Sequence, residues 1–234
     1  MHLDPWFSSW NDAFLRLLFD RIPHSRVTDE FSDLLISNPL LSAWVFSAWF
    51  YRYWMKEDED RSNHKQELTS AVIALVVAGV VTLVLRPWIH WPAPVLNPAF
   101  RSLFPQNLWG NGNGNCFPSH STLAYFTIAA GFWTLNRWLS VWLCAMSLLF
   151  VALPRIYLGG HYPIDVLFSC ILAIFTLMAV RRLRRARRAP SDLPGFAERA
   201  LSAIFYLWVF ELGEGFRSAE SLVRMGQHAY RWWR

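Results

Sequence analysis

Charged residues are scarce in this 234-residue chain: Asp, Glu, Lys and Arg make up 17% of it, against 54% hydrophobic residues. Soluble domains of ordinary composition carry about 25% charged residues. Long uncharged stretches recur along the chain, and its mean hydropathy is +0.20. These values exclude an ordinary soluble domain and indicate an integral membrane protein.

Cysteine is also rare, and the three present are Cys116, Cys144 and Cys170. Their separations do not follow the short paired spacing of cysteine metal ligands. The last two fall inside apolar stretches. We therefore expect three free thiols and no cysteine-held metal ion.

The chain lacks a basic start followed by an apolar core within residues 1–10, so we expect no cleavable signal peptide. It also lacks internal repeats and low-complexity tracts. The apolar stretches themselves would direct membrane insertion.

Five of these stretches approach the roughly 20 residues that a helix needs to cross a bilayer. The shorter ones require tilting, local thinning or Trp and Arg anchors. A further segment, 6–22, is typical of an amphipathic or re-entrant helix. We predict an all-α polytopic membrane helical bundle with about five to six spans, including 34–51, 69–85, 121–136, 138–154 and 166–180.

The net charge of +5 is dominated by an arginine run at 181–188, immediately after the last apolar stretch. This position follows the positive-inside rule, so we interpret the run as a topology signal and expect no nucleic-acid partner. A cytoplasmic run puts the start of the fifth span at the external face. The mixed-charge loop 52–67 is then cytoplasmic, and the loop 88–117 is external.

One segment just before the fifth span combines an arginine, a histidine and an aspartate at fixed spacing. If a helix opens near Pro163, Asp165 lies on the same side as His161 and can hold one ring nitrogen. Arg155 offers planar donors that suit a tetrahedral oxyanion. The Gly159-Gly160 pair allows a tight turn between them. Together they predict phosphate chemistry through a histidine nucleophile.

Two further motifs converge on the same external boundary. Arg86-Pro87 closes the second span, and the sequence Phe-Pro-Ser-His-Ser at 117–121 opens the third. Helix N-termini offer free backbone N–H groups there, and Ser119 adds a hydroxyl donor. His120 could protonate a leaving oxygen.

With these motifs in this order, residues 69–180 resemble the phosphatidic acid phosphatase type 2 superfamily of membrane lipid phosphatases. The resemblance implies that His161 is the nucleophile that forms a phosphohistidine. It also implies that Asp165 orients this ring, that His120 is the leaving-group acid, and that no metal or other cofactor is needed. Phosphate would be bound by Arg86, Ser119 and Arg155.

The sequence departs from the family pattern at three places. Gly79 stands where the first motif usually has lysine, and His90 or Arg101 could substitute for that cation. His120 follows the motif serine directly instead of one residue later, which turns a helical side chain by about 100°. In the third motif, proline replaces the common serine before Arg155.

The resemblance implies a lipid phosphate substrate: a polyprenyl diphosphate or a phospholipid phosphate of a bacterial inner membrane, met on the periplasmic or exterior side. A lipid phosphotransferase using the same histidine and a non-catalytic lipid-binding protein are the alternatives. We expect a membrane phosphatase domain over residues 1–188, with its core at 69–180. Residues 189–234 would form an interfacial helical tail, or a partner-binding helix.

Overall fold

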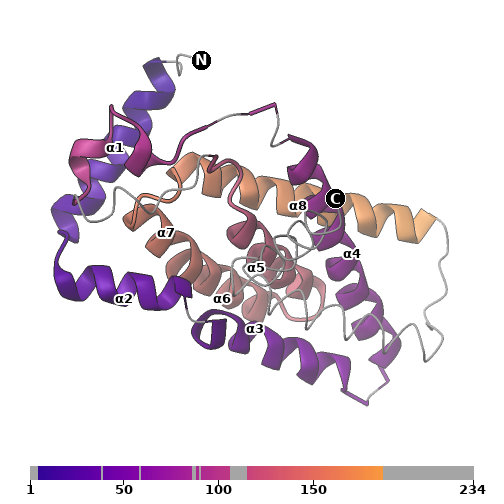
Figure 1. Cartoon of the computed structure of the whole chain (residues 1–234). Coiled ribbons are helices and arrows are strands. Elements are labelled where there is room, and N and C mark those ends of the chain that lie inside the picture. Colours follow the sequence, from indigo (N-terminus) through magenta and orange to yellow (C-terminus); the bar gives the residue numbers. More distant parts are fainter. Residues whose placement is uncertain are drawn as a thin grey trace, which may run out of the picture.

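The computed structural model describes residues 5–37, 39–57, 59–85, 88–89, 91–105 and 115–186, and the predicted tail at 189–234 lies outside them. Every regular element in the described ranges is a helix, which confirms the all-α prediction (Figure 1). The main helices are α1 (Pro5–Arg21), α2 (Arg26–Ser37), α3 (Pro39–Trp54), α4 (Arg61–Leu85), α5 (His120–Gly131), α6 (Arg137–Met146), α7 (Leu153–Tyr157) and α8 (Pro163–Ala186). Shorter turns are η1 (Pro94–Leu96), η2 (Arg101–Leu103), η4 (Phe132–Thr134) and η5 (Ser147–Ala152).

Three helices of the described chain are long and apolar enough to cross a membrane: Arg61–Leu85, Arg137–Tyr157 and Pro163–Ala186. They contain three of the predicted spans. The second is continuous because α6, the π-helical turn η5 and α7 follow one another directly. The π turn comes just before Pro154, whose ring nitrogen has no proton for the usual helical hydrogen bond.

Two other predicted spans appear as the shorter helices α3, of 16 residues, and α5, of 12 residues. Helix α5 packs against α4, α8, α6 and η5, and most of its side chains are buried. A helix that is apolar all round and enclosed by other helices is a core helix. Its short length is therefore compatible with the bundle, since neighbouring helices surround it.

One end of the bundle gathers the termini of four helices, and we call it the arginine end. Arg181 Nη2 donates to the carbonyl of Gly131 at 2.8 Å, which joins the C-terminal parts of α8 and α5. Arg181 Nε lies 2.6 Å from Glu67 Oε2 near the start of α4. Tyr53, near the end of α3, meets Phe132 edge-on at 5.4 Å between ring centroids. Helices α3, α5 and α8 therefore end where α4 begins.

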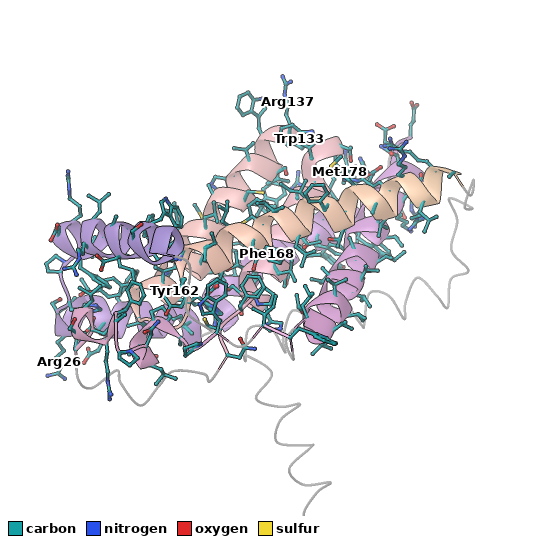
Figure 2. All side chains as sticks on the ribbon, turned by 90° about the horizontal axis from the view of Figure 1, so that it is seen from above. Arg26, Trp133, Arg137, Tyr162, Phe168 and Met178 are labelled. Atoms are coloured by element: carbon teal, nitrogen blue, oxygen red, sulfur yellow. The ribbon has the colours of Figure 1, made fainter. Side chains whose placement is uncertain are left out.

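The opposite end, which we call the site end, gathers the starts of α2, α5 and α8 and the end of α7. Tyr157 of α7 bonds Thr28 of α2, and the Phe117 ring lies 4.7 Å from that of Phe168 of α8. Seen from above in Figure 2, Arg26 and Tyr162 lie toward one end of the molecule and Met178 toward the other. All the described residues of the predicted motifs lie at the site end.

Glu67 differs from the sequence prediction, which put it in the charged loop 52–67. Helix α3 continues to Trp54 and α4 begins at Arg61, so Glu67 lies inside α4 with only 7% of its surface exposed. Its pairing with Arg181 makes this burial possible, since a charge among apolar helices needs a partner.

Exposed apolar side chains follow the outer faces of two of the long helices, as expected for a lipid-facing surface. On α4 they are Ile73, Val76, Val77, Val80, Leu83 and Val84, and on α8 they are Leu167, Ile171, Ile174, Phe175 and Met178.

Candidate functional site

The turn between α7 and α8 is fixed by a pair of helix-ending hydrogen bonds. The N–H of Gly160 donates to the carbonyl of Arg155 at 2.8 Å, and the N–H of Gly159 donates to that of Ile156 at 3.0 Å. Gly159 has a φ of 72°, a left-handed conformation that glycine adopts without strain. This is a Schellman ending, and it places His161 one turn beyond Arg155.

Helix α8 begins immediately after this turn, with Pro163 as its first residue. The N–H of Tyr162 donates to Oδ2 of Asp165 at 2.8 Å, and the N–H of Asp165 donates back to the carbonyl of Tyr162 at 3.0 Å. A carboxylate in this first turn satisfies a free N–H group and interacts favourably with the helix dipole. Asp165 is completely buried and held in one orientation.

The same oxygen of Asp165 faces His161. Oδ2 lies 3.8 Å from Nδ1 of the imidazole, and the histidine side chain is 14% exposed. This separation is longer than a hydrogen bond but within ion-pair range. Catalytic contacts are often longer without substrate and shorten in its presence.

Three buried polar atoms of this turn have no hydrogen-bond partner among the described residues: Nε of Arg155, Nδ1 of His161 and Oδ1 of Asp165. Buried polar atoms are nearly always bonded, so each such atom calls for an explanation. Their grouping within eleven consecutive residues is typical of a site that completes its bonds with a ligand.

The Ser-His pair opens α5 at the same end of the bundle. Ser119 is the residue that precedes the helix, and His120 is the first helical residue and is partly buried. Ser119 is completely buried, and its hydroxyl lies 2.9 Å from that of Thr122. The sequence predicts a phosphate donor at Ser119, and in the structure this hydroxyl pairs with that of Thr122 on the same helix.

Cys116, which the sequence analysis treats only as a free thiol, connects the second motif to the third. It has no disulfide, as predicted, and is 2% exposed. Burial, and then the nearby Asp165 carboxylate, raise the pKa of its thiol well above the usual range. The sequence signal for the contact between Cys116 and Asp165 is the position of Cys116 directly before Phe117-Pro118 of the second motif.

A loop joins the end of α4 to the start of α5. Asn115 Nδ2 donates to the carbonyl of Ile89 at 2.8 Å, and Asn115 Oδ1 accepts from the N–H of Trp91 at 3.3 Å. Arg86 and His90 lie outside the described residues. Arg101 is exposed on η2, and Gly79 lies on α4. Of the first motif, the structure therefore describes Gly79 on α4 but not Arg86.

The three long apolar helices define an integral membrane protein, and its buried polar site lies at one end of the helical bundle. The chain matches the PAP2 superfamily over residues 67–189, more than half of its length, and it belongs to that family. This confirms the resemblance seen in the sequence. No curated protein and no solved structure shows significant similarity to the chain. The family comprises phosphatases and phosphotransferases, so the protein acts on phosphate esters.

Proposed function

We propose that the protein is a membrane lipid phosphate phosphatase. It removes the terminal phosphate of a polyprenyl diphosphate or a phospholipid phosphate through a phosphohistidine on His161. The observation that carries this proposal is the single capped turn that presents Arg155, His161 and Asp165 together, with a buried unpartnered polar atom on each.

In the first step, His161 attacks the phosphorus in line while the bond from phosphorus to the lipid oxygen breaks. Nδ1 faces Asp165, so Nε2 is the attacking nitrogen. The carboxylate holds a proton on Nδ1 and stabilises the charged ring. His120 supplies a proton to the leaving lipid oxygen. A water molecule then breaks the nitrogen–phosphorus bond and releases inorganic phosphate.

The phosphate oxygens are held by Arg155 and Arg86, whose planar guanidinium groups suit a tetrahedral anion. Ser119 has one hydroxyl proton, which it directs either to Thr122 or to the phosphate. Charge that develops on the transferring group is thus met by fixed donors within a largely buried site.

The proposed orientation places the arginine end in the cytoplasm and the site end at the periplasmic or exterior face of a bacterial inner membrane. The site then lies at headgroup level, where the phosphate of a membrane lipid is found. We further propose that residues 1–188 form the membrane phosphatase domain, with its core at 69–180.

The test is phosphate release by detergent-purified protein from undecaprenyl diphosphate and from phosphatidic acid, with EDTA present. The wild type should release phosphate, whereas His161→Ala should not. His64→Gln serves as the matched control, because His64 is buried beside Tyr53 at the arginine end. Transfer to an added acceptor lipid, with no free phosphate, would identify the phosphotransferase. Binding of lipid without either product would contradict an enzymatic role.

A further inference from the structure

Residues 22–28, which comprise the connection between α1 and α2 and the start of α2, fold against the turn between α7 and α8 although they lie outside the family match at 67–189. We call these residues the elbow. Helix α1 precedes it and packs on the same side, with Leu15 fully buried in a cluster that contains Val95, Phe104 and Tyr162. The N-terminal part of the chain therefore contacts the segments that surround the site.

Tyr157 joins the elbow to α7. Its hydroxyl donates to the carbonyl of Pro23 at 3.1 Å and lies 2.7 Å from the hydroxyl of Thr28. The ring of His24 lies over that of Tyr157 at 4.4 Å between centroids. Tyr157 is the last residue of α7, two positions after Arg155 and two before Gly159. A shift of this side chain would move the end of the helix from which the catalytic turn begins.

Phe104 makes a second connection from the elbow side. Phe19 meets the Phe104 ring edge-on at 5.3 Å, and His24 meets it at 6.0 Å. Phe104 also lies so close to Gly159 that an added Cβ would come within 2.8 Å of its ring. The left-handed glycine of the turn is thus covered by a ring that the elbow holds in place.

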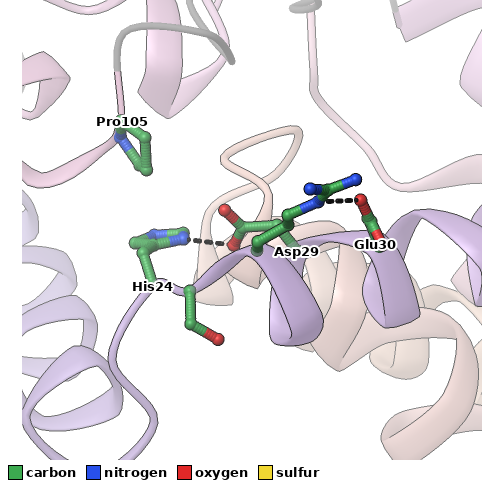
Figure 3. A pocket seen from close by; sticks show the side chains of 6 residues that line it. His24, Asp29, Glu30 and Pro105 are labelled. Atoms are coloured by element: carbon green, nitrogen blue, oxygen red, sulfur yellow. Dashed lines mark hydrogen bonds and ion pairs between the residues drawn. The ribbon is translucent and has the colours of Figure 1, made fainter.

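A cavity of about 510 Å³ lies beside the elbow, lined by His24, Ser25, Arg26, Asp29, Glu30 and Pro105. Figure 3 shows Pro105 facing the pair formed by His24 and Asp29, whose Nδ1 and Oδ1 atoms are 2.8 Å apart. Tyr157 and the Phe104 ring are thus two contacts through which the elbow reaches the turn.

We propose that the elbow is a positioning element for catalysis. Two contacts hold the end of α7 and the turn: Tyr157 bonds Pro23 and Thr28, and Phe104 packs on Gly159. They keep Arg155 and His161 positioned to contact the phosphate. The elbow touches no reacting atom and acts only through these contacts. This inference rests on the proposed phosphatase function.

The test compares Tyr157→Phe and Thr28→Val, which remove the hydroxyl contact, with Thr28→Ser, which keeps it. Tyr53→Phe is the matched control, because it makes the same chemical change at the arginine end. We expect Tyr157→Phe to lower kcat about tenfold, equivalent to about 1.4 kcal/mol, with KM changed less than about twofold. Thr28→Ser should retain the wild-type kcat. The double variant should lose less than the sum of the two single losses, since the two changes share the contact between Tyr157 and Thr28, while Tyr157 also donates to Pro23 and Thr28 also pairs with Ser25.

Hydrogen exchange of the backbone amides at 155–165 provides a readout that does not depend on activity. Exchange there should quicken in Tyr157→Phe and stay at the wild-type rate in Tyr53→Phe. An active enzyme in which Tyr157→Phe changes neither kcat nor exchange would overturn the positioning role. If exchange quickens in Tyr157→Phe but the wild type lacks phosphatase activity, the positioning role of the elbow is supported and the proposed function is contradicted.

Discussion

Oδ2 of Asp165 lies 3.8 Å from Nδ1 of His161 while accepting the N–H of Tyr162 at 2.8 Å. One carboxylate oxygen thus both begins helix α8 and faces the proposed nucleophile. The local fold and the chemistry of the site depend on the same atom, and substitutions at this position can separate the two roles.

Asp165→Asn should retain the fold and lose activity. The asparagine side chain still offers an oxygen to the N–H of Tyr162, but it has no charge to stabilise the imidazolium or hold its proton. We expect kcat to fall by a factor of about 10² to 10⁴, as for loss of a general acid–base partner. Asp165→Ala should lose the helix contact as well and be less stable than Asp165→Asn by about 1 kcal/mol. Kinetics and thermal unfolding of both variants measure the two effects, and full activity in Asp165→Asn would contradict the assigned role.

Gly159→Ala should disrupt the catalytic turn. An added Cβ would meet Phe104 at 2.8 Å and Val95 at 2.9 Å, in a backbone conformation with φ of 72° that alanine rarely adopts. We expect a loss of about 1–3 kcal/mol in unfolding free energy, together with reduced turnover. The matched control is Gly160→Ala, whose Cβ would lie 3.3 Å from the Arg155 carbonyl oxygen. Equal stability of the two variants in denaturant titrations would refute this interpretation of the turn.

Glu67→Gln should destabilise the arginine end without altering the site directly. Glu67 and Arg181 are both largely buried, with side chains 9% and 13% exposed, so removing the carboxylate leaves Arg181 without its charge partner. Breaking such a pair costs about 3–5 kcal/mol. The control is Arg185→Gln, because Arg185 is 70% exposed and 3.9 Å from Glu67, and it should have a small effect. Thermal unfolding in detergent measures the stability of both variants. An unchanged Tm for Glu67→Gln would contradict the importance of this pair.

Stability should fall at alkaline pH in a way that depends on Cys116. Burial and Asp165 raise the pKa of its thiol, whereas the unfolded thiol titrates near its ordinary value of about 8.5. Above that value the unfolded state binds fewer protons than the folded state, so this contribution to stability is present below about pH 8.5 and is lost as pH rises. We expect Tm to decline between about pH 8 and about pH 10, and less steeply in Cys116→Ala. Parallel declines would show that Cys116 does not contribute.

The sequence predicts the long helices well because their apolar stretches are continuous. It also predicts a tight turn at Gly159-Gly160 and a helix start at Pro163, since glycine and proline act through local backbone geometry. Helix α2 was not predicted, because its charged residues interrupt any apolar run. Helix α2 ends at Ser37 and α3 begins at Pro39, so two helices share the stretch 34–51 that was predicted as one span.

Contacts between distant segments could not be predicted. The Tyr157 and Thr28 hydroxyls are 129 positions apart in sequence, and neither residue type distinguishes a bonded side chain from an exposed one. The same holds for Glu67 and Arg181, which pattern alone assigns to a loop and to a topology signal. Spacing within one segment predicts Arg155, His161 and Asp165 as candidate site residues, whereas the residues that support the turn are brought together only by the fold.

The most direct test of the account is to trap the covalent intermediate. Purified protein is mixed with ³²P-labelled lipid substrate, quenched in alkali within milliseconds and digested, and the labelled peptide is sequenced. A phosphohistidine mechanism predicts alkali-stable, acid-labile phosphate on His161, absent from His161→Ala and accumulating before phosphate release. Steady turnover with label on another residue, or with no covalent label at any time, would contradict it.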